Sequence, residues 1–259
     1  MYIPKGVPCS LVMLVCRCPL LVVPLILGLA FGLPHPGVIS QPVVPEAMIT
    51  FAFDDGYLSA YNTAFPILER YSYQGTVFAI TANINQPGYI TANQLQELAN
   101  KGWEIGSHTV SHPYLTQLSD AQILSEIRDS KLFLEGLGLS ACSLSSPYGD
   151  YDQRVLAMAG DYYLAHLASW PAALNDIPLN NYQNEICCLS AVAVEAKTTV
   201  QEVIDWITQA KEQHKWLILL FHRLDECGDY NWPSQDLETV VRFAYEQGFQ
   251  GQSLSQQVP

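Results

Sequence analysis

The sequence predicts an α/β fold in which parallel strands form either a barrel or an open sheet. Strand-like and helix-like segments alternate along the chain from Met48 onward, as expected when helices connect successive parallel strands. Segment 216–221 is an uninterrupted apolar run, which is typical of a strand buried on both faces. Functional residues in such folds lie at the carboxyl ends of the strands, so the functional residues of this protein are expected at those ends.

The first half of this region alternates between predicted strands and helices. Thr91 and Ser119 are suited to cap two of the helices, and Gly102 follows the end of one of them. The helices are placed at 59–71, 91–100 and 119–137. The strands are placed at 48–53, 76–80, 103–106 and 142–146.

The second half continues the alternation after a longer irregular segment, 170–189. Strands are predicted at 162–166 and 216–221, with a terminal strand near Phe249. Helices are predicted at 200–213 and 234–246.

Composition excludes several classes of protein. The 259 residues include 12 Lys plus Arg against 25 Asp plus Glu, which gives a formal net charge of −13. Nucleic-acid-binding proteins present a basic face that displaces phosphate counterions, so this balance argues against a nucleic-acid partner. Hydrophobic residues make up 49% of the chain and charged residues 14%, which excludes a disordered chain and predicts one sizeable core.

The amino-terminal residues predict export. Residues 1–33 are interpreted as a signal peptide or an uncleaved membrane anchor, because 11–33 is almost wholly apolar with Arg17 as its only charge. The Pro/Gly-rich segment 34–46 is interpreted as a linker, and 47–259 as one domain. Cleavage and retention both remain open, and either predicts an extracellular, cell-surface or periplasmic domain.

Two adjacent carboxylates end the first predicted strand. Asp54 and Asp55 follow the apolar residues 51–53, and Gly56 allows a turn. Successive side chains of a strand point to opposite sides, so the two carboxylates are expected to diverge and to take different roles. One could bind a metal while the other acts as a base. Taken alone, this motif is more typical of a solvated turn.

Three histidines are candidates for the same chemistry. His108 and His112 are four residues apart, a spacing that places both imidazoles on one face of a helical turn, although Pro113 indicates a loop. Two histidines and one aspartate with open coordination positions suit a catalytic metal that activates water. His222 follows the apolar strand 216–221 and is well placed as a general acid. Each of the three could instead be an ordinary buried or surface histidine.

The order of these motifs resembles the polysaccharide deacetylase family, the NodB homology domain of carbohydrate esterase family 4. The resemblance covers about 48–252 and implies a distorted (β/α) barrel with a metal-dependent N-deacetylase or O-deacetylase site. The matching segments are Phe53-Asp54-Asp55-Gly56, Ser107-His108-Thr109-Val110-Ser111-His112, Ser146-Pro147-Tyr148-Gly149 and Leu220-Phe221-His222.

The resemblance also implies roles for individual residues. Asp54 would be the catalytic base and His222 the acid. The ligands of a divalent metal, most often zinc in this family, would be Asp55, His108 and His112. On the substrate side, the backbone N–H of Tyr148 would hold the oxyanion and Leu220 would line the pocket for the acetyl methyl. Further substrate-binding positions are Pro147 and Trp170.

Two departures from the family pattern stand out. The Arg that orients the base Asp in many members is replaced by Ser145, and Arg223 is a candidate substitute cation. The fourth motif, an Asp and Trp pair that supports the acid His, is not cleanly present, although Trp170 and Asp176 lie in the expected segment.

The leading hypothesis is therefore an exported, metal-dependent hydrolase that removes acetyl groups from an acetylated polysaccharide. One alternative is a related metal-dependent amidohydrolase acting on a small C–N substrate. Another is a catalytically silent glycan-binding module on the same barrel. Which glycan is the substrate stays open, as does the oligomeric state of the protein. Loop aromatics suited to stacking on sugar rings are Tyr89, Trp170, Tyr182, Tyr230 and Trp232.

Overall fold

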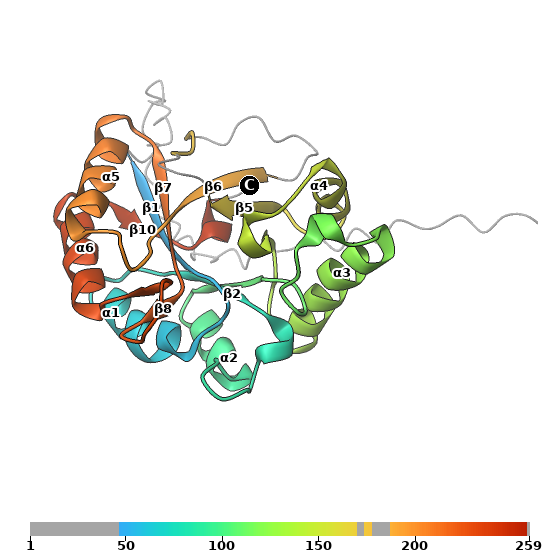
Figure 1. Ribbon diagram of the computed structural model, residues 1–259. Helices are drawn as coiled ribbons and strands as arrows, with labels where there is room; N and C mark the ends of the chain where they lie inside the picture. Colours follow the sequence, from blue (N-terminus) through green and yellow to red (C-terminus); the bar gives the residue numbers. More distant parts are fainter. Residues whose placement is uncertain (1–46, 170–173, 178–186, 258–259) are drawn as a thin grey trace, which may run out of the picture. The chain divides into compact units, whose positions relative to one another are not determined.

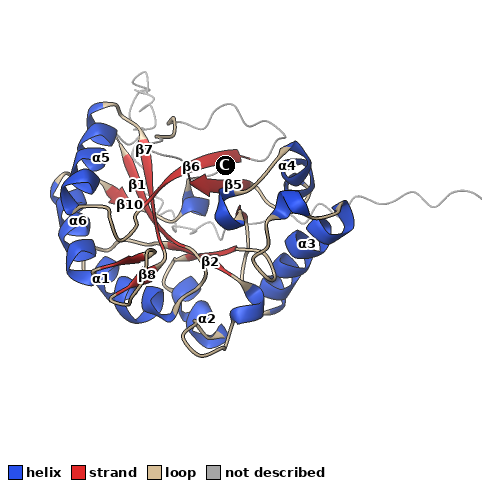
Figure 2. Cartoon of the chain, viewed as in Figure 1, coloured by secondary structure: helices blue, strands red, loops and turns tan. Residues whose placement is uncertain are grey.

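The structure is a computed structural model that describes residues 47–169, 174–177 and 187–257. These residues form a barrel of seven parallel strands with helices around it (Figures 1 and 2). Strands β1 to β7 follow one another around the barrel in chain order, and pairing between β1 and β7 closes it. The closure decides between the two predicted architectures in favour of the barrel.

The elements have the following bounds. The barrel strands are β1 (Met48–Phe53), β2 (Thr76–Ala79), β3 (Glu104–Ser107), β4 (Ser143–Ser145), β5 (Ala165–Ser169), β6 (Cys187–Ala193) and β7 (Trp216–Phe221). The helices are α1 (Phe65–Glu69), α2 (Ala92–Asn100), α3 (Asp120–Gly136), α4 (Gln153–Gly160), α5 (Val200–Glu212) and α6 (Ser234–Glu246). Short strands β8 (Arg223–Leu224) and β9 (Asn231–Trp232) pair with each other, and β10 (Gln250–Gly251) pairs with the start of β1.

Alternation along the strands divides the apolar residues into two cores. Phe51 and Phe53 of β1 belong to the larger core, which lies between the barrel and its helices. Ala52 belongs to the smaller core together with Trp216 and Leu220, and these side chains fill the inside of the barrel. Because both faces of β1 and β7 are covered, these two strands consist of buried residues throughout.

A buried carboxylate and the C-terminal turn close the bottom of the barrel. Glu104 is 4% exposed. Its carboxylate accepts hydrogen bonds from Ser143 Oγ at 2.5 Å and from the Ser255 amide at 2.6 Å. Leu254, in the same turn, is fully buried in the inner core, and its amide donates to Thr76 Oγ1. The buried polar groups at this end of the barrel are thus hydrogen-bonded within the protein. The site lies at the opposite end.

Gly106 of β3 allows this packing. A Cβ at Gly106 would lie 2.5 Å from ring carbons of Phe78, closer than packed atoms tolerate. The absence of a side chain lets the Phe78 ring occupy the barrel interior beneath the site.

Most predicted elements are confirmed, including the bounds of β1, β7 and α6. Three differ. The strand predicted at 162–166 is β5 and begins at Ala165. Strand β6 was missed because its sequence is rich in small residues and lacks alternation, and α4 was missed because it has only eight residues. The sequence does contain a capping residue for α4, since the Asp152 carboxylate accepts hydrogen bonds from the amides of Arg154 and Val155.

The predicted signal or anchor (1–33) and linker (34–46) lie outside the described residues. Within the part of the chain that the structure describes, no helix combines the length and apolar character needed to cross a bilayer.

Candidate active site

A cavity opens at the carboxyl ends of the barrel strands, where the sequence predicted the functional residues. Seven of the predicted site residues line it: Asp54, Asp55, His108, His112, Tyr148, Leu220 and His222. Pro147 is buried beneath its turn and is not among the described residues that line the cavity. Trp170 lies outside the described residues.

Asp55, His108 and His112 form a group that could hold a metal ion. Asp55 Oδ1 lies 3.5 Å from His108 Nε2 and 3.4 Å from His112 Nε2. These separations are too long for strong hydrogen bonds. Two ligand atoms that are each about 2.1 Å from one tetrahedral ion lie about 3.4 Å apart, so both separations from Asp55 match a shared divalent ion. All three ligand atoms lie within 4.8 Å of one another.

Both imidazoles are prepared to act as neutral ligands. Burial lowers the pKa of His108, and burial together with the neighbouring His108 lowers the pKa of His112 to about 4. The Nδ1–H of His108 can donate to the Ser145 carbonyl at 2.8 Å, which directs the lone pair of Nε2 toward the cavity. This is the usual arrangement behind a metal-binding histidine.

The two histidines lie in a loop, as Pro113 indicates, and not on a helical turn. Thr109 and His112 have positive φ values of 66° and 63°, which fold the segment tightly. Glu126 of α3 holds this loop, because its carboxylate accepts from the amides of Val110 and Ser111 at 2.8 and 2.9 Å. Sequence reasoning missed Glu126, which lies on the helix after the motif.

Asp54 is the buried carboxylate of the site, with 4% exposure. Its Oδ2 accepts a hydrogen bond from Ser145 Oγ at 3.1 Å. Burial raises the pKa of Asp54 to about 7, because desolvation of the carboxylate outweighs its attraction to His222 and the hydrogen bond from Ser145. Such a pKa suits a general base near neutral pH.

The two carboxylates do not diverge as predicted. Asp54 and Asp55 both line the cavity. The chain leaves the extended conformation at Asp55, whose φ is 69°, and this turn brings its carboxylate back beside that of Asp54. Both lie near His108 Nε2, with Asp54 Oδ2 at 3.7 Å and Asp55 Oδ1 at 3.5 Å. Their other partners differ, since Asp54 contacts Ser145 and Asp55 contacts His112.

Two buried side-chain atoms lack a hydrogen-bond partner within the described residues, Asp54 Oδ1 and His222 Nδ1. They belong to the predicted base and the predicted acid. A buried polar atom without a partner is costly in a folded protein and commonly marks a place where water or a ligand binds.

Tyr148 lies in a tight turn at the edge of the cavity. Its φ is 60°, a left-handed conformation within the turn. Its ring is stacked on Tyr114 at 3.9 Å between centroids, and its other neighbour is the His112 ring at 4.5 Å. Tyr114 and Tyr148 are 46% and 56% exposed, so this aromatic pair borders the cavity on the solvent side.

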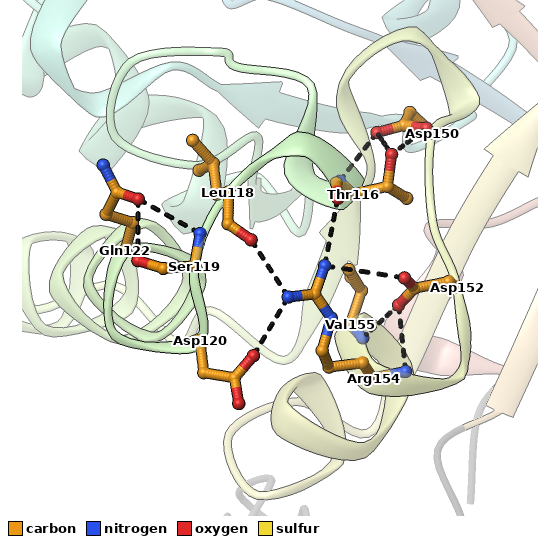
Figure 3. Close-up of polar contacts among 9 residues, drawn as sticks. All are labelled: Thr116, Leu118, Ser119, Asp120, Gln122, Asp150, Asp152, Arg154 and Val155. Atoms are coloured by element: carbon orange, nitrogen blue, oxygen red, sulfur yellow. Dashed lines mark hydrogen bonds and ion pairs between the residues drawn. The ribbon is translucent and has the colours of Figure 1, made fainter.

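Arg154 fixes the two loops that carry this pair (Figure 3). Its guanidinium donates to the carbonyls of Thr116 and Leu118 and to Asp120, each at 3.0 Å. Asp150 accepts from the amide and hydroxyl of Thr116 at 2.9 Å. The loop after Tyr114 is thereby tied to the turn that contains Tyr148.

The far side of the cavity is formed by β6 and β7. His222 follows β7, and Tyr230 lies beside it with ring centroids 4.9 Å apart. Glu195, two residues after β6, also lines the cavity and was missed by sequence reasoning. Glu195 can be placed at the cavity only when the register between β6 and β7 is known. That register could not be derived from the sequence because β6 was not predicted.

Three expectations for the surrounding residues are corrected. Arg223 lies over the Tyr57 ring and pairs with Glu226, so it does not replace the base-orienting Arg. Trp232 is 1% exposed and donates to the Thr198 carbonyl, which makes it a core residue rather than a sugar platform. Asp176 pairs with Lys215 instead of supporting His222.

Comparison with known proteins gives a consistent result. The family model for polysaccharide deacetylase matches residues 42–165. YxkH of Bacillus subtilis, named provisionally as a polysaccharide deacetylase, is 36% identical over 115 residues, 44% of this chain and 41% of that protein. A peptidoglycan-N-acetylglucosamine deacetylase of Bacillus cereus is 30% identical over 127 residues, 48% of this chain and 58% of that protein. The chain therefore spans less than two thirds of either relative.

Solved structures agree on the fold. The deacetylase PplD of Streptococcus pyogenes, in complex with acetate, is 25% identical with a TM-score of 0.52, covering 60% of this chain and 68% of that one. The Xyl-CE4 domain of a multidomain xylanase from the hindgut metagenome of Trinervitermes trinervoides is 22% identical with a TM-score of 0.59, covering 81% and 88%. Together with the matched motifs, these likenesses show that the chain is similar to the polysaccharide deacetylase family, most clearly over residues 42–165.

Proposed function

We propose that this protein is a metal-dependent hydrolase that removes acetyl groups from an acetylated polysaccharide. The observation that carries the proposal is the convergence of three metal-ligand side chains with Asp54 and His222 in one cavity. Asp54 and His222 are also the residues whose buried atoms lack partners among the described residues. These features match the requirements of a site that binds a reacting water and a substrate.

Asp55, His108 and His112 would hold the metal, and two nitrogens with one oxygen suit zinc. A divalent ion bound there would polarise the acetyl carbonyl and lower the pKa of water. Neutral imidazoles are needed for this binding, and the lowered pKa values of His108 and His112 provide them near neutral pH.

Asp54 is the proposed base. It would accept a proton from the attacking water through Oδ1, while the hydrogen bond from Ser145 fixes Oδ2. The backbone N–H of Tyr148 would donate to the oxyanion that forms on the acetyl carbonyl. Leu220 would contact the acetyl methyl, since it lines the cavity as an apolar side chain. His222 would give its proton to the leaving nitrogen or oxygen.

A polysaccharide is favoured as substrate by the surroundings of the cavity. The Tyr114–Tyr148 pair and Tyr230 are exposed aromatic groups on two sides of it, and aromatic faces suit the apolar faces of sugar rings. The Bacillus cereus relative is named for deacetylation of N-acetylglucosamine in peptidoglycan. A glycan outside the cell also agrees with the predicted export segment 1–33, whether cleaved or retained as an anchor.

The silent glycan-binding alternative loses its main support. It rested on the missing Arg at Ser145, yet the Ser145 hydroxyl contacts the Asp54 carboxylate directly. A binding module has no need of a buried carboxylate oriented beside a metal site.

The test is acetate release by the full chain from a panel of acetylated glycans, with and without added zinc. Asp54→Ala and His108→Ala are measured in parallel. We expect zinc-dependent release that both variants lose, since one lacks the base and the other a ligand. If the wild-type chain binds zinc but releases no acetate from chitin oligomers, peptidoglycan, poly-N-acetylglucosamine or acetylxylan, the proposal is wrong.

A further inference from the structure

Glu195 and His222 follow two adjacent barrel strands, β6 and β7, at equivalent positions in the strand register. Ala193 of β6 aligns with Leu220 of β7, and the Val194 amide donates to the Leu220 carbonyl at 2.8 Å. Two residues further along each chain, Glu195 and His222 both line the cavity. Residues two apart on a strand share a face, so Glu195 follows Ala193 into the cavity as His222 follows Leu220.

Glu195 is free to interact with a ligand. Its side chain is 31% exposed, and the ion pair recorded for it joins it to Lys197 Nζ at 3.2 Å. Lys197 is 87% exposed, so this pair is screened by solvent and holds the carboxylate weakly. The described residues that line the cavity include no Lys or Arg, so no lining residue pairs with the Glu195 carboxylate as a cation.

Amide and ester hydrolysis differ in the charge of the leaving group. In both reactions the water oxygen bonds to the acetyl carbon, one water proton goes to Asp54, and the bond from carbon to the leaving atom breaks as His222 gives it a proton. An alkoxide leaving group becomes a neutral alcohol. A nitrogen leaving group is positively charged while it holds both the proton from His222 and the bond to carbon; it leaves as an amine, which takes the proton of the acetic acid and becomes an ammonium beside acetate. The proton on Asp54 returns to His222 through solvent, which restores both groups.

We propose that Glu195 makes this site selective for acetamido sugars over O-acetyl sugars. Its carboxylate lines the same cavity as the proton donor, and the protonated leaving nitrogen carries a positive charge there that a leaving oxygen does not. The charge-assisted interaction therefore lowers the barrier for C–N cleavage alone and also binds the amine product. This inference rests on the proposed deacetylase function and narrows its substrate to an N-acetylated glycan.

The test compares wild-type, Glu195→Gln and Glu212→Gln full-length chains loaded with zinc. Gln keeps the shape of Glu and removes its charge. Glu212 ends α5, at the opposite end of the barrel from the cavity, and gives the same change in net charge. Acetate release is measured from an N-acetylglucosamine oligomer and from an O-acetylated xylo-oligosaccharide.

We expect Glu195→Gln to lower kcat/KM for the N-acetylated oligomer roughly tenfold, to change ester turnover less than about twofold, and Glu212→Gln to change neither. An equal loss on both substrates, or no loss on either, would overturn the selectivity assigned to Glu195.

A binding measurement separates this inference from the proposed function. Calorimetry with a fully deacetylated glucosamine oligomer should show roughly tenfold weaker binding to Glu195→Gln than to wild type, with N-acetylated oligomer binding unchanged. If wild type releases no acetate at all, the proposed function fails, and this comparison still decides the role of Glu195. Equal affinities of wild type and Glu195→Gln for the deacetylated oligomer would count against it.

Discussion

The Ser145 hydroxyl donates to the Asp54 carboxylate at 3.1 Å, at the position where many family members carry an arginine. The serine keeps one function of that arginine, because a donor fixed on β4 still orients the carboxylate. It cannot supply a positive charge. Asp54 is therefore oriented without a cation, and desolvation dominates its pKa.

Removing this hydroxyl should impair turnover more than binding. Ser145→Ala is expected to lower kcat roughly tenfold, with KM nearly unchanged, because a hydrogen bond to a charged group is lost and Asp54 becomes less well oriented. Ser145→Thr retains a hydroxyl and should recover most of the rate. Steady-state kinetics on an acetylated oligomer measures both, and an Ala variant as fast as wild type would show that the contact does not orient the base.

Glu126 is expected to matter for metal affinity although it touches no metal ligand side chain. Glu126→Ala frees the amides of Val110 and Ser111, so the loop that holds His108 and His112 loses its anchor. Zinc affinity, measured by competition with a chelating dye, should fall roughly tenfold or more. Glu135→Ala on the same helix is the control and should leave the affinity unchanged. Equal affinities for the two variants would argue against the anchoring role.

His166 should make stability depend on pH. It is buried with Nε2 2.7 Å from Ser146 Oγ, and burial lowers its pKa from 6.5 to about 4. The unfolded chain therefore binds this proton more readily than the folded chain. The contribution to stability is fully present above pH 6.5 and is lost as the pH falls toward 4, by roughly 3 kcal/mol at most.

Urea unfolding of wild type and His166→Gln between pH 4 and 7 measures this effect. The variant should be less stable at pH 7, and its stability should fall less steeply toward pH 4. Parallel pH dependence in the two proteins would contradict the assignment to His166.

Tyr114 should contribute to binding of long substrates only. Tyr114→Ala removes the partner stacked on Tyr148 and one exposed aromatic face. KM for an acetylated oligomer is expected to rise roughly threefold to tenfold, while turnover of 4-nitrophenyl acetate stays unchanged. Loss of activity on both substrates would instead indicate that the stack supports the histidine loop.

Much of the fold could be predicted because burial and helix caps leave clear patterns. The bounds of β1 and β7 follow closely from their apolar runs. The start of α2 follows from the capping box of Thr91 with Gln94. Closure of the barrel could not be derived from such patterns, because it depends on pairing between β1 and β7, which are distant in sequence.

The residues of the site also divide into those that could be predicted from the sequence and those that could not. Asp55, His108 and His112 could be found from the motif residues, and the structure brings their ligand atoms together. Ser145, Glu126 and Glu195 act through hydrogen bonds or register between separate elements, so their positions required the three-dimensional structure. The divergence expected of Asp54 and Asp55 failed because strand alternation stops where φ of Asp55 becomes positive.

Metal binding and proton transfer are assigned to different residues of one cavity. The most direct measurement is zinc stoichiometry and acetate release in Asp54→Asn beside His112→Ala, both in the full chain. We expect Asp54→Asn still to bind one zinc ion but to release acetate at least about a hundredfold more slowly, whereas His112→Ala should lose both zinc binding and acetate release. Acetate release by Asp54→Asn at the wild-type rate would contradict this assignment.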